Sequence, residues 1–80
     1  MNNISVSLNS KDQIREFIQI NTKSGCQVDV SDGRSFIDGK SLLGLLSLAL
    51  FHPLSVSLIG EDASTAKVFE AYKEHNLLAV

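Results

Sequence analysis

The stretch LLGLLSLALF occupies residues 42–51, and it is apolar except for Gly44 and Ser47. It has half of the roughly 20 residues that a membrane-spanning helix needs, and Pro53 follows closely. The stretch therefore predicts a short helix that begins after an N-cap at Ser41 and ends before Pro53. Because a short helix lying on a sheet buries only one side, some of its leucines must be exposed.

Two other segments alternate apolar residues with serines, which is the pattern of a strand with one buried face. Asn3 to Leu8 contains ISVSL, and the segment that begins at Leu54 is the near repeat LSVSL. Their apolar residues are expected in the core. The serines are expected on a face that meets water: Ser5, Ser7, Ser55 and Ser57.

A hairpin is predicted between these two strands. Gln27 to Val30 and Arg34 to Asp38 flank the dipeptide Asp32-Gly33, which tolerates the positive φ angles of a tight turn. Phe36 then falls on the open face of the sheet. The opposite, buried face would carry Val28, Val30 and Ile37.

An amphipathic helix is predicted from Lys11 to about Thr22. Ser10 and Gln13 fit a capping box, in which the Ser10 hydroxyl accepts from the Gln13 amide and the Gln13 side chain reaches back. The buried stripe of this helix would comprise Ile14, Phe17, Ile18 and Asn21.

A last helix, capped by Asp62 or Ser64, is predicted to end near Asn76. Its stripe would comprise Thr65, Val68, Phe69 and Tyr72. The order is then strand, helix, strand, strand, helix, strand, helix. Because the strands alternate apolar with polar residues, they need a cover on one face only. We expect an α+β fold in a single domain, residues 1–80, with one four-stranded sheet.

Composition narrows the class of protein. A chain of 80 residues closes around one small core and buries about 60% of its unfolded surface. A formal charge of −2, a pI near 5.5 and seven scattered Lys and Arg residues give no basic footprint for nucleic acid. Cys26 is the only cysteine, and the chain begins without a secretion signal, so we expect a cytoplasmic protein without disulfides. The wide spacing of histidines and cysteine predicts no metal, and no motif indicates a cofactor.

The segment GKSLLGLLSL, Gly39 to Leu48, resembles the Lys-Ser-(Ile/Leu)-Met-Gly-Val-Met-Ser-Leu segment of HPr. HPr is the histidine-containing phosphocarrier protein of the bacterial sugar phosphotransferase system. The Lys-Ser, Gly and Ser-Leu spacings match, and the likeness extends without a gap from about Ser10 to Tyr72. It implies an open-faced β-sandwich in βαββαβα order, with a four-stranded antiparallel sheet covered on one face by three helices.

The chemistry of that family is not carried over. HPr proteins have Gly-Ile-His-Ala-Arg-Pro where the first helix begins, and this histidine accepts phosphate from enzyme I. In the gapless register Ser10 stands at the place of the histidine and Asp12 at that of the arginine. A phosphoryl group on imidazole needs the ring nitrogen and nearby positive charge. We therefore expect no catalytic residue, no enzyme activity and no phosphorelay from this site.

Ser41 and His52 are the other candidate phosphate acceptors in the sequence. Ser41 matches the serine that a kinase phosphorylates in many HPr proteins, and a phosphate there would lie beside Lys40 at the positive end of a helix. An N-cap explains the same serine. His52 is an alternative phosphoacceptor, although it is expected at the negative end of its helix. Capping explains Ser10, and His75 is expected in solvent.

Protein contact is the expected means of action. In HPr proteins the apolar residues of the short helix, with the start of the first helix, dock enzyme I, the sugar-specific proteins and regulatory partners. By position Leu42, Leu43 and Leu46 inherit that role, and internal packing or a homodimer are the alternatives. The preferred function is a regulatory protein-binding module. A phosphocarrier that uses His52, or a homodimeric scaffold joined through Phe36, remain alternatives.

Overall fold

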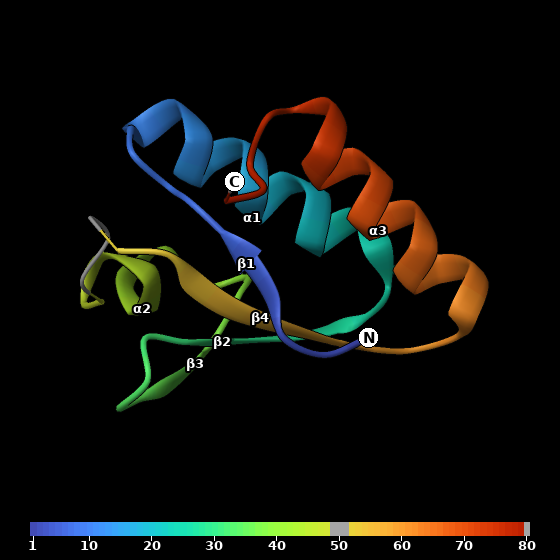
Figure 1. Cartoon of the computed structure of the whole chain (residues 1–80), viewed down its shortest axis with the longest axis horizontal. Coiled ribbons are helices and arrows are strands. Elements are labelled where there is room, and N and C mark those ends of the chain that lie inside the picture. The colour runs from blue at the N-terminus through green and yellow to red at the C-terminus, as the bar shows by residue number, and fades with distance from the viewer. Residues whose placement is uncertain (49–51, 80) are drawn as a thin grey trace.

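The chain folds into a four-stranded antiparallel sheet with three helices (Figure 1). The structure is a computed structural model, and it describes residues 1–48 and 52–79. The strands lie in the order β1-β4-β2-β3. Along the chain the elements are β1 (Ile4–Val6), α1 (Lys11–Ser24), β2 (Gln27–Ser31), β3 (Phe36–Asp38), α2 (Leu42–Leu46), β4 (Leu54–Ile59) and α3 (Asp62–Glu74). The predicted α+β class and order of elements are confirmed.

The register of the sheet separates a core face from an open face, as the alternating pattern predicted. On the core face, Val56 of β4 pairs with both Ile4 and Val30, and all three side chains are buried. One residue along, the open face carries a row that crosses all four strands: Ser5, Ser55, Ser31 and Phe36. Ser7 lies beyond the end of β1 and is half-buried, so it is not part of this face.

The core lies between the sheet and the pair of long helices. Figure 1 shows α1 and α3 side by side, and α2 near the start of β4, where it contacts α1 and β3. Phe17 of α1 and Tyr72 of α3 are fully buried, and their ring centroids are 5.2 Å apart. Burying one such large side chain stabilises the fold by about 1.5–3 kcal/mol. The predicted stripes are confirmed, with Ile18 and Phe69 partly buried at their margins.

Helix α1 begins where the sequence predicted and ends two residues later. The Gln13 N–H donates to the Ser10 hydroxyl at 3.2 Å, as expected of the N-cap. The Gln13 side chain accepts from the Asn9 N–H at 2.7 Å, one residue before the cap, so the reciprocal half of the predicted capping box is shifted. The helix stops at Gly25, which has a φ of 72° and so takes the left-handed conformation of a helix C-cap.

Helix α3 starts without the side-chain cap that the sequence predicted. Its N-cap is Glu61, which makes no side-chain cap hydrogen bond, and Asp62 and Ser64 lie inside the helix. Asp62 still contributes, because a negative charge in the first turn interacts favourably with the helix dipole.

Helix α2 is shorter than predicted. It ends at Leu46, and Leu50 and Phe51 lie outside the described residues. The Ser47 hydroxyl donates to the Gly44 carbonyl at 2.6 Å, and the Ser47 N–H is shared between two earlier carbonyls. Serine competes in this way with helical hydrogen bonding, and glycine lowers helix propensity, so the helix ends early.

The loop between β2 and β3 has Asp32-Gly33 at its start, as predicted. Gly33 has a φ of 96°, which glycine adopts without strain. The Asp32 carboxylate accepts from the backbone N–H groups of Ser35 and Arg34, each at 2.9 Å. These two bonds hold the pKa of Asp32 below its usual range.

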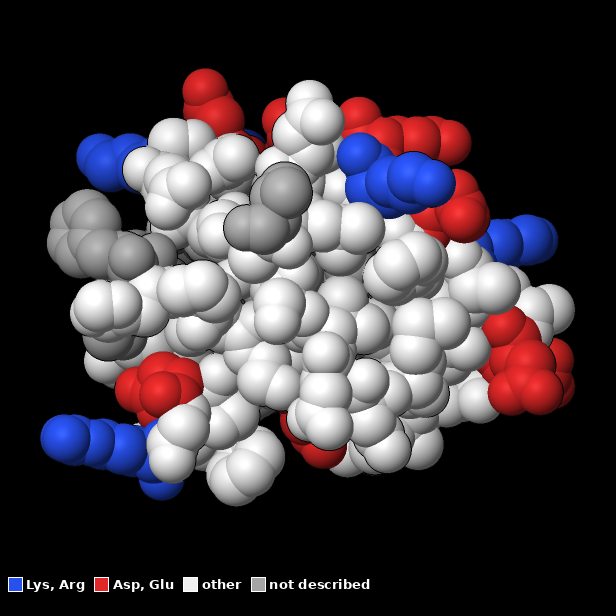
Figure 2. All heavy atoms as spheres, in the orientation of Figure 1, with Lys and Arg blue, Asp and Glu red and all other residues white. Residues whose placement is uncertain are grey.

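The segment after α3 returns to the outer edge of β1. Asn76 has a φ of 58°, which reverses the chain, and the next residue, Leu77, is fully buried. The Ser7 N–H donates to Leu77 O at 2.8 Å, and the Ala79 N–H donates to Ser5 O at 2.9 Å. In Figure 2 the face over β1, β4 and this segment is largely free of charged side chains, which gather at its rim. Within the described ranges, no helix has the length and apolar character to cross a membrane.

Candidate functional site

An apolar groove of about 380 Å³ lies between α1 and α2. Leu42 and Leu46 line it from α2, and each side chain is 52% exposed. Residues of α1 complete the lining: Lys11, Ile14, Arg15, Ile18 and Gln19. Its volume falls within the range of ligand pockets in proteins.

The geometry of a helical turn decides which leucines reach the groove. Leu42 and Leu46 are four residues apart, so they lie on the same face of α2. Leu45 points away from this face into the core and is fully buried. Leu43 is 82% exposed and does not line the groove. Of the three predicted partner-binding leucines, the structure thus brings two together in one hollow and places the third beside it.

The sequence alone did not show which residues of α1 line the groove. Ile14 and Ile18 were predicted as core residues, and Ile14 is indeed buried, while Ile18 is half-buried and accessible from the groove. Positive charges flank this wall in the sequence, but they do not by themselves show that it faces α2. Lys11 and Arg15 follow one another at the same i, i+4 spacing as the two isoleucines.

Positive charge flanks the groove. Lys11 and Arg15 are both exposed and line it. Across the part of the chain that the structure describes, the one ion pair joins His75 and Glu16, so neither groove cation is paired with a carboxylate. Both charges remain available to an incoming anionic group.

His75 does not lie beside Ser10 at the start of α1. Ser10 is exposed and its hydroxyl serves as the helix cap. His75 was expected in solvent, but its Nδ1 lies 2.9 Å from Glu16 Oε2 and its side chain is 49% exposed. Glu16 is six residues beyond Ser10, which is about 9 Å along the helix axis. His75 therefore contacts the middle of α1, away from its N-terminus.

The two remaining phosphate-acceptor candidates lie on either side of α2. The Gly44 N–H donates to the Ser41 hydroxyl at 3.1 Å, so Ser41 has the geometry of an N-cap. His52 is exposed. Because α2 ends at Leu46, His52 does not sit at the negative end of a helix, and that part of the prediction was wrong.

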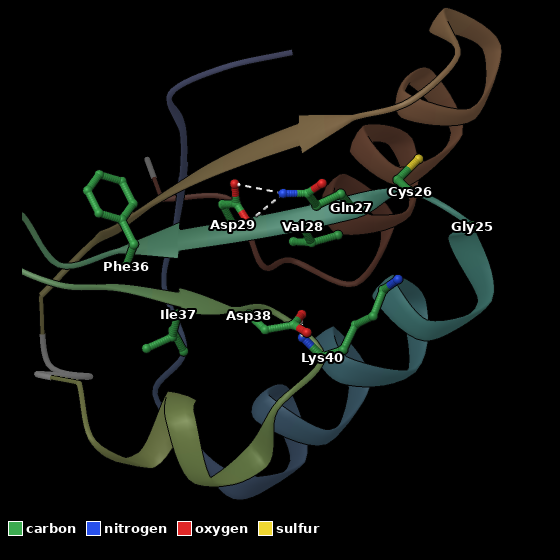
Figure 3. Close-up of a pocket in the computed structure, with 9 residues that line it drawn as sticks. All are labelled: Gly25, Cys26, Gln27, Val28, Asp29, Phe36, Ile37, Asp38 and Lys40. Carbon is green, nitrogen blue, oxygen red and sulfur yellow. Dashed lines mark hydrogen bonds between the residues drawn. The ribbon is translucent and has the colours of Figure 1, made fainter.

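Phe36 belongs to a different surface from the groove. Figure 3 shows Phe36 and Ile37 pointing to opposite sides of β3, with Ile37 directed toward α2. Phe36, which is 79% exposed, lines a depression along β2 and β3 that also contains Asp29 and Asp38. Gln27 Nε2 donates to the Asp29 carboxylate at 3.3 Å. Among the described residues, no group of three or more His, Cys, Asp or Glu is placed to hold a metal ion.

The antiparallel order β1-β4-β2-β3, with α1 and α3 covering one face, defines the HPr-like fold. The crystal structure of HPr-C-His from Thermoanaerobacter tengcongensis is similar, with a TM-score of 0.70 and 18% sequence identity. The similarity covers 92% of this chain and 83% of that chain. Protein-family models and curated protein sequences give no match to this chain. The shared fold is thus established by structure, at a sequence identity that carries no residue roles with it.

Proposed function

We propose that this chain is a non-catalytic, HPr-like module that binds protein partners of the phosphotransferase system, or of its regulation, in the cytoplasm. The observation that supports this most is the α1–α2 groove. Two half-exposed leucines face two isoleucines there, on the helices where the resemblance to HPr locates partner docking. Apolar side chains exposed together in a hollow are typical of a protein-binding site.

The lining of the groove also indicates which side chains a partner segment would present. Its apolar lining fits the side chains of a partner segment, such as one face of a helix. Lys11 and Arg15 would then face carboxylates on that segment, which favours encounter and fixes orientation more than it adds affinity. The proposed partner therefore presents apolar side chains flanked by acidic ones.

The residues at the start of α1 support binding without phosphate transfer. Ser10 has no ring nitrogen to carry a phosphoryl group, and Asp12 adds negative charge where that group would have to be stabilised. Ser41 remains a candidate for regulatory phosphorylation, because a phosphate there would place charge next to the groove leucine Leu42.

A titration with enzyme I tests the docking site. The backbone amides of α1 and α2 should shift in NMR spectra when unlabelled enzyme I is added. Leu46→Glu should abolish the shifts, because it buries a charge in the interface. Ile59→Glu is the matched control, since Ile59 is 51% exposed but lies on β4, away from the groove. Equal binding by both variants would remove the groove from the proposal.

A phosphorylation assay tests the second part of the proposal. Incubation with enzyme I and phosphoenolpyruvate should leave the chain without acid-labile phosphate, while an HPr that has its histidine is labelled in parallel. Label that disappears in His52→Ala would establish the alternative, a phosphocarrier that uses His52.

A further inference from the structure

Asn21 is a fully buried polar residue at the point where three segments of the chain meet. It lies on α1, and its Nδ2 donates to the Gly39 carbonyl at 2.7 Å. The Tyr72 hydroxyl of α3 donates to Asn21 Oδ1. The carboxamide thus links α1, α3 and the segment that leads into α2.

The direction of these hydrogen bonds is fixed by the groups involved. A backbone carbonyl only accepts, so the amide nitrogen of Asn21 must face Gly39 and its oxygen must face Tyr72. Burial, which disfavours the charged phenolate, raises the pKa of Tyr72 above its ordinary value of 10, so the hydroxyl keeps its proton. Asn21 therefore has one orientation in which both partners are satisfied.

Gly39 is held against the core by both of its backbone polar groups. Its N–H donates to Val28 O at 2.8 Å, and its carbonyl accepts from Asn21. A Cβ at this position would lie 2.5 Å from Val28 Cγ1 and 3.0 Å from Asn21 Nδ2. The backbone thus passes closer to the core than any residue with a side chain allows.

Helix α2 needs such an anchor, because five residues are too few for a helix that is stable by itself. Among the described residues, Leu48 directly after α2 is also buried in the core, so it anchors the far end of the helix, while Gly39 anchors the end that leads into it. Leu45 is buried, and Gly44 lies against the Ile37 side chain, since a Cβ there would be 3.2 Å from Ile37 Cδ1. Gly39 is three residues before Leu42, the first groove residue of α2, so a shift of Gly39 is passed directly to the groove.

We propose that Asn21 is a positioning residue for α2, and that its hydrogen bond to Gly39 sets the separation of the two walls of the groove. Helix α1 then supplies one wall through Ile14 and Ile18, and fixes the other wall through Asn21. Tyr72 acts through Asn21 by orienting its carboxamide. The consequence for partner binding rests on the proposed function, whereas the consequence for the position of α2 does not.

The experiment compares Asn21→Leu with Tyr72→Phe. Asn21→Leu keeps the number and branching of the side-chain heavy atoms and removes both hydrogen bonds, while Tyr72→Phe removes only the bond between Tyr72 and Asn21. The measurement is the NOE between the methyl groups of Ile18 and Leu46, which line the two walls, together with the chemical shifts of residues 39–46. Both should change strongly in Asn21→Leu and little in Tyr72→Phe. If Asn21→Leu does not fold, Asn21→Ser replaces it, because its hydroxyl is too short to reach Gly39.

Binding of enzyme I is then measured for the same variants. Asn21→Leu should weaken it roughly tenfold, and Tyr72→Phe should weaken it much less. An unchanged NOE and unchanged shifts in Asn21→Leu would overturn the positioning role. If the NOE changes but the wild-type chain does not bind enzyme I, the proposed function fails while the positioning role stands.

Discussion

The α1–α2 groove and the open face of the sheet both expose large apolar side chains, but they do so in different surroundings. In the groove, Leu42 and Leu46 face two isoleucines across a hollow. On the open face, Phe36 stands at the end of a row of serines, near two carboxylates. Several apolar side chains that line one hollow exclude water together when a partner binds. A single aromatic side chain surrounded by polar residues does not. The difference favours the groove as the docking site.

The largest effect is expected inside α2, where neighbouring leucines have opposite environments. Leu45→Ala should lower the free energy of unfolding by about 2–5 kcal/mol, because Leu45 is fully buried. Leu43→Ala should change it by less than about 0.5 kcal/mol, because Leu43 is 82% exposed. Urea unfolding measures both values. Similar losses in the two variants would show that α2 does not pack as described.

Tyr72, which contacts Asn21 in the core, should make the stability of the fold depend on alkaline pH. Its pKa is raised in the folded state, mainly by desolvation, so the unfolded chain loses this proton first. The free energy of unfolding should therefore fall as pH rises above 10, by up to about 1.4 kcal/mol per pH unit. Tyr72→Phe should remove this contribution from the slope. Tyr72 is the only tyrosine and the chain has no tryptophan, so near-ultraviolet absorbance follows its ionisation directly, and ionisation near pH 10 in the folded protein would contradict the expectation.

Removing either serine cap should have a smaller effect, and the comparison distinguishes the two walls of the groove. Ser41→Ala and Ser10→Ala should each destabilise the fold by about 1 kcal/mol, because each leaves one backbone N–H of a first helical turn unpaired. Only Ser41→Ala should also weaken the NOE between Ile18 and Leu46, because α2 is short while α1 is long and well packed. Thermal unfolding and the same NMR spectra measure both effects. The comparison fails if Ser10→Ala disturbs the NOE as much.

The smallest effect is expected on the open face. Phe36→Ser should change the free energy of unfolding by less than about 0.5 kcal/mol, because Phe36 is 79% exposed. Sedimentation equilibrium at rising concentration should give the monomer mass for both the wild type and the variant, since a two-fold contact at Phe36 would bring Asp29 and Asp38 of both copies together. A wild-type dimer that Phe36→Ser dissociates would instead establish the homodimeric scaffold.

The fold was predictable because its periodicities are strong and local. Alternation identified the core face of β4, and the i, i+3, i+4 spacing identified the buried stripe of α1, including Asn21. Helix ends were less predictable, because several residues compete for the same role. Glu61 is the N-cap of α3 although Asp62 and Ser64 are better cap formers, since the path of the chain after β4 decides where the helix begins.

Only the α2 wall of the groove was predictable from the sequence. Exposed leucines follow from the excess of apolar residues on a short helix, so α2 could be identified. The residues of α1 that face them depend on how the two helices cross, which no local pattern contains. The bond between Asn21 and Gly39 joins residues 18 positions apart and was likewise invisible. A buried asparagine in an otherwise apolar stripe was its only trace.

The segment after α3 has a consequence for solubility. Leu77 and Ala79 form hydrogen bonds with the backbone groups on the outer edge of β1. Without them, that edge would present unpaired N–H and C=O groups beside a largely uncharged surface, which is the arrangement that lets strands of separate molecules join. A shortened chain that ends at Asn76 is accordingly expected to aggregate as it folds, even though every residue of the groove would still be present.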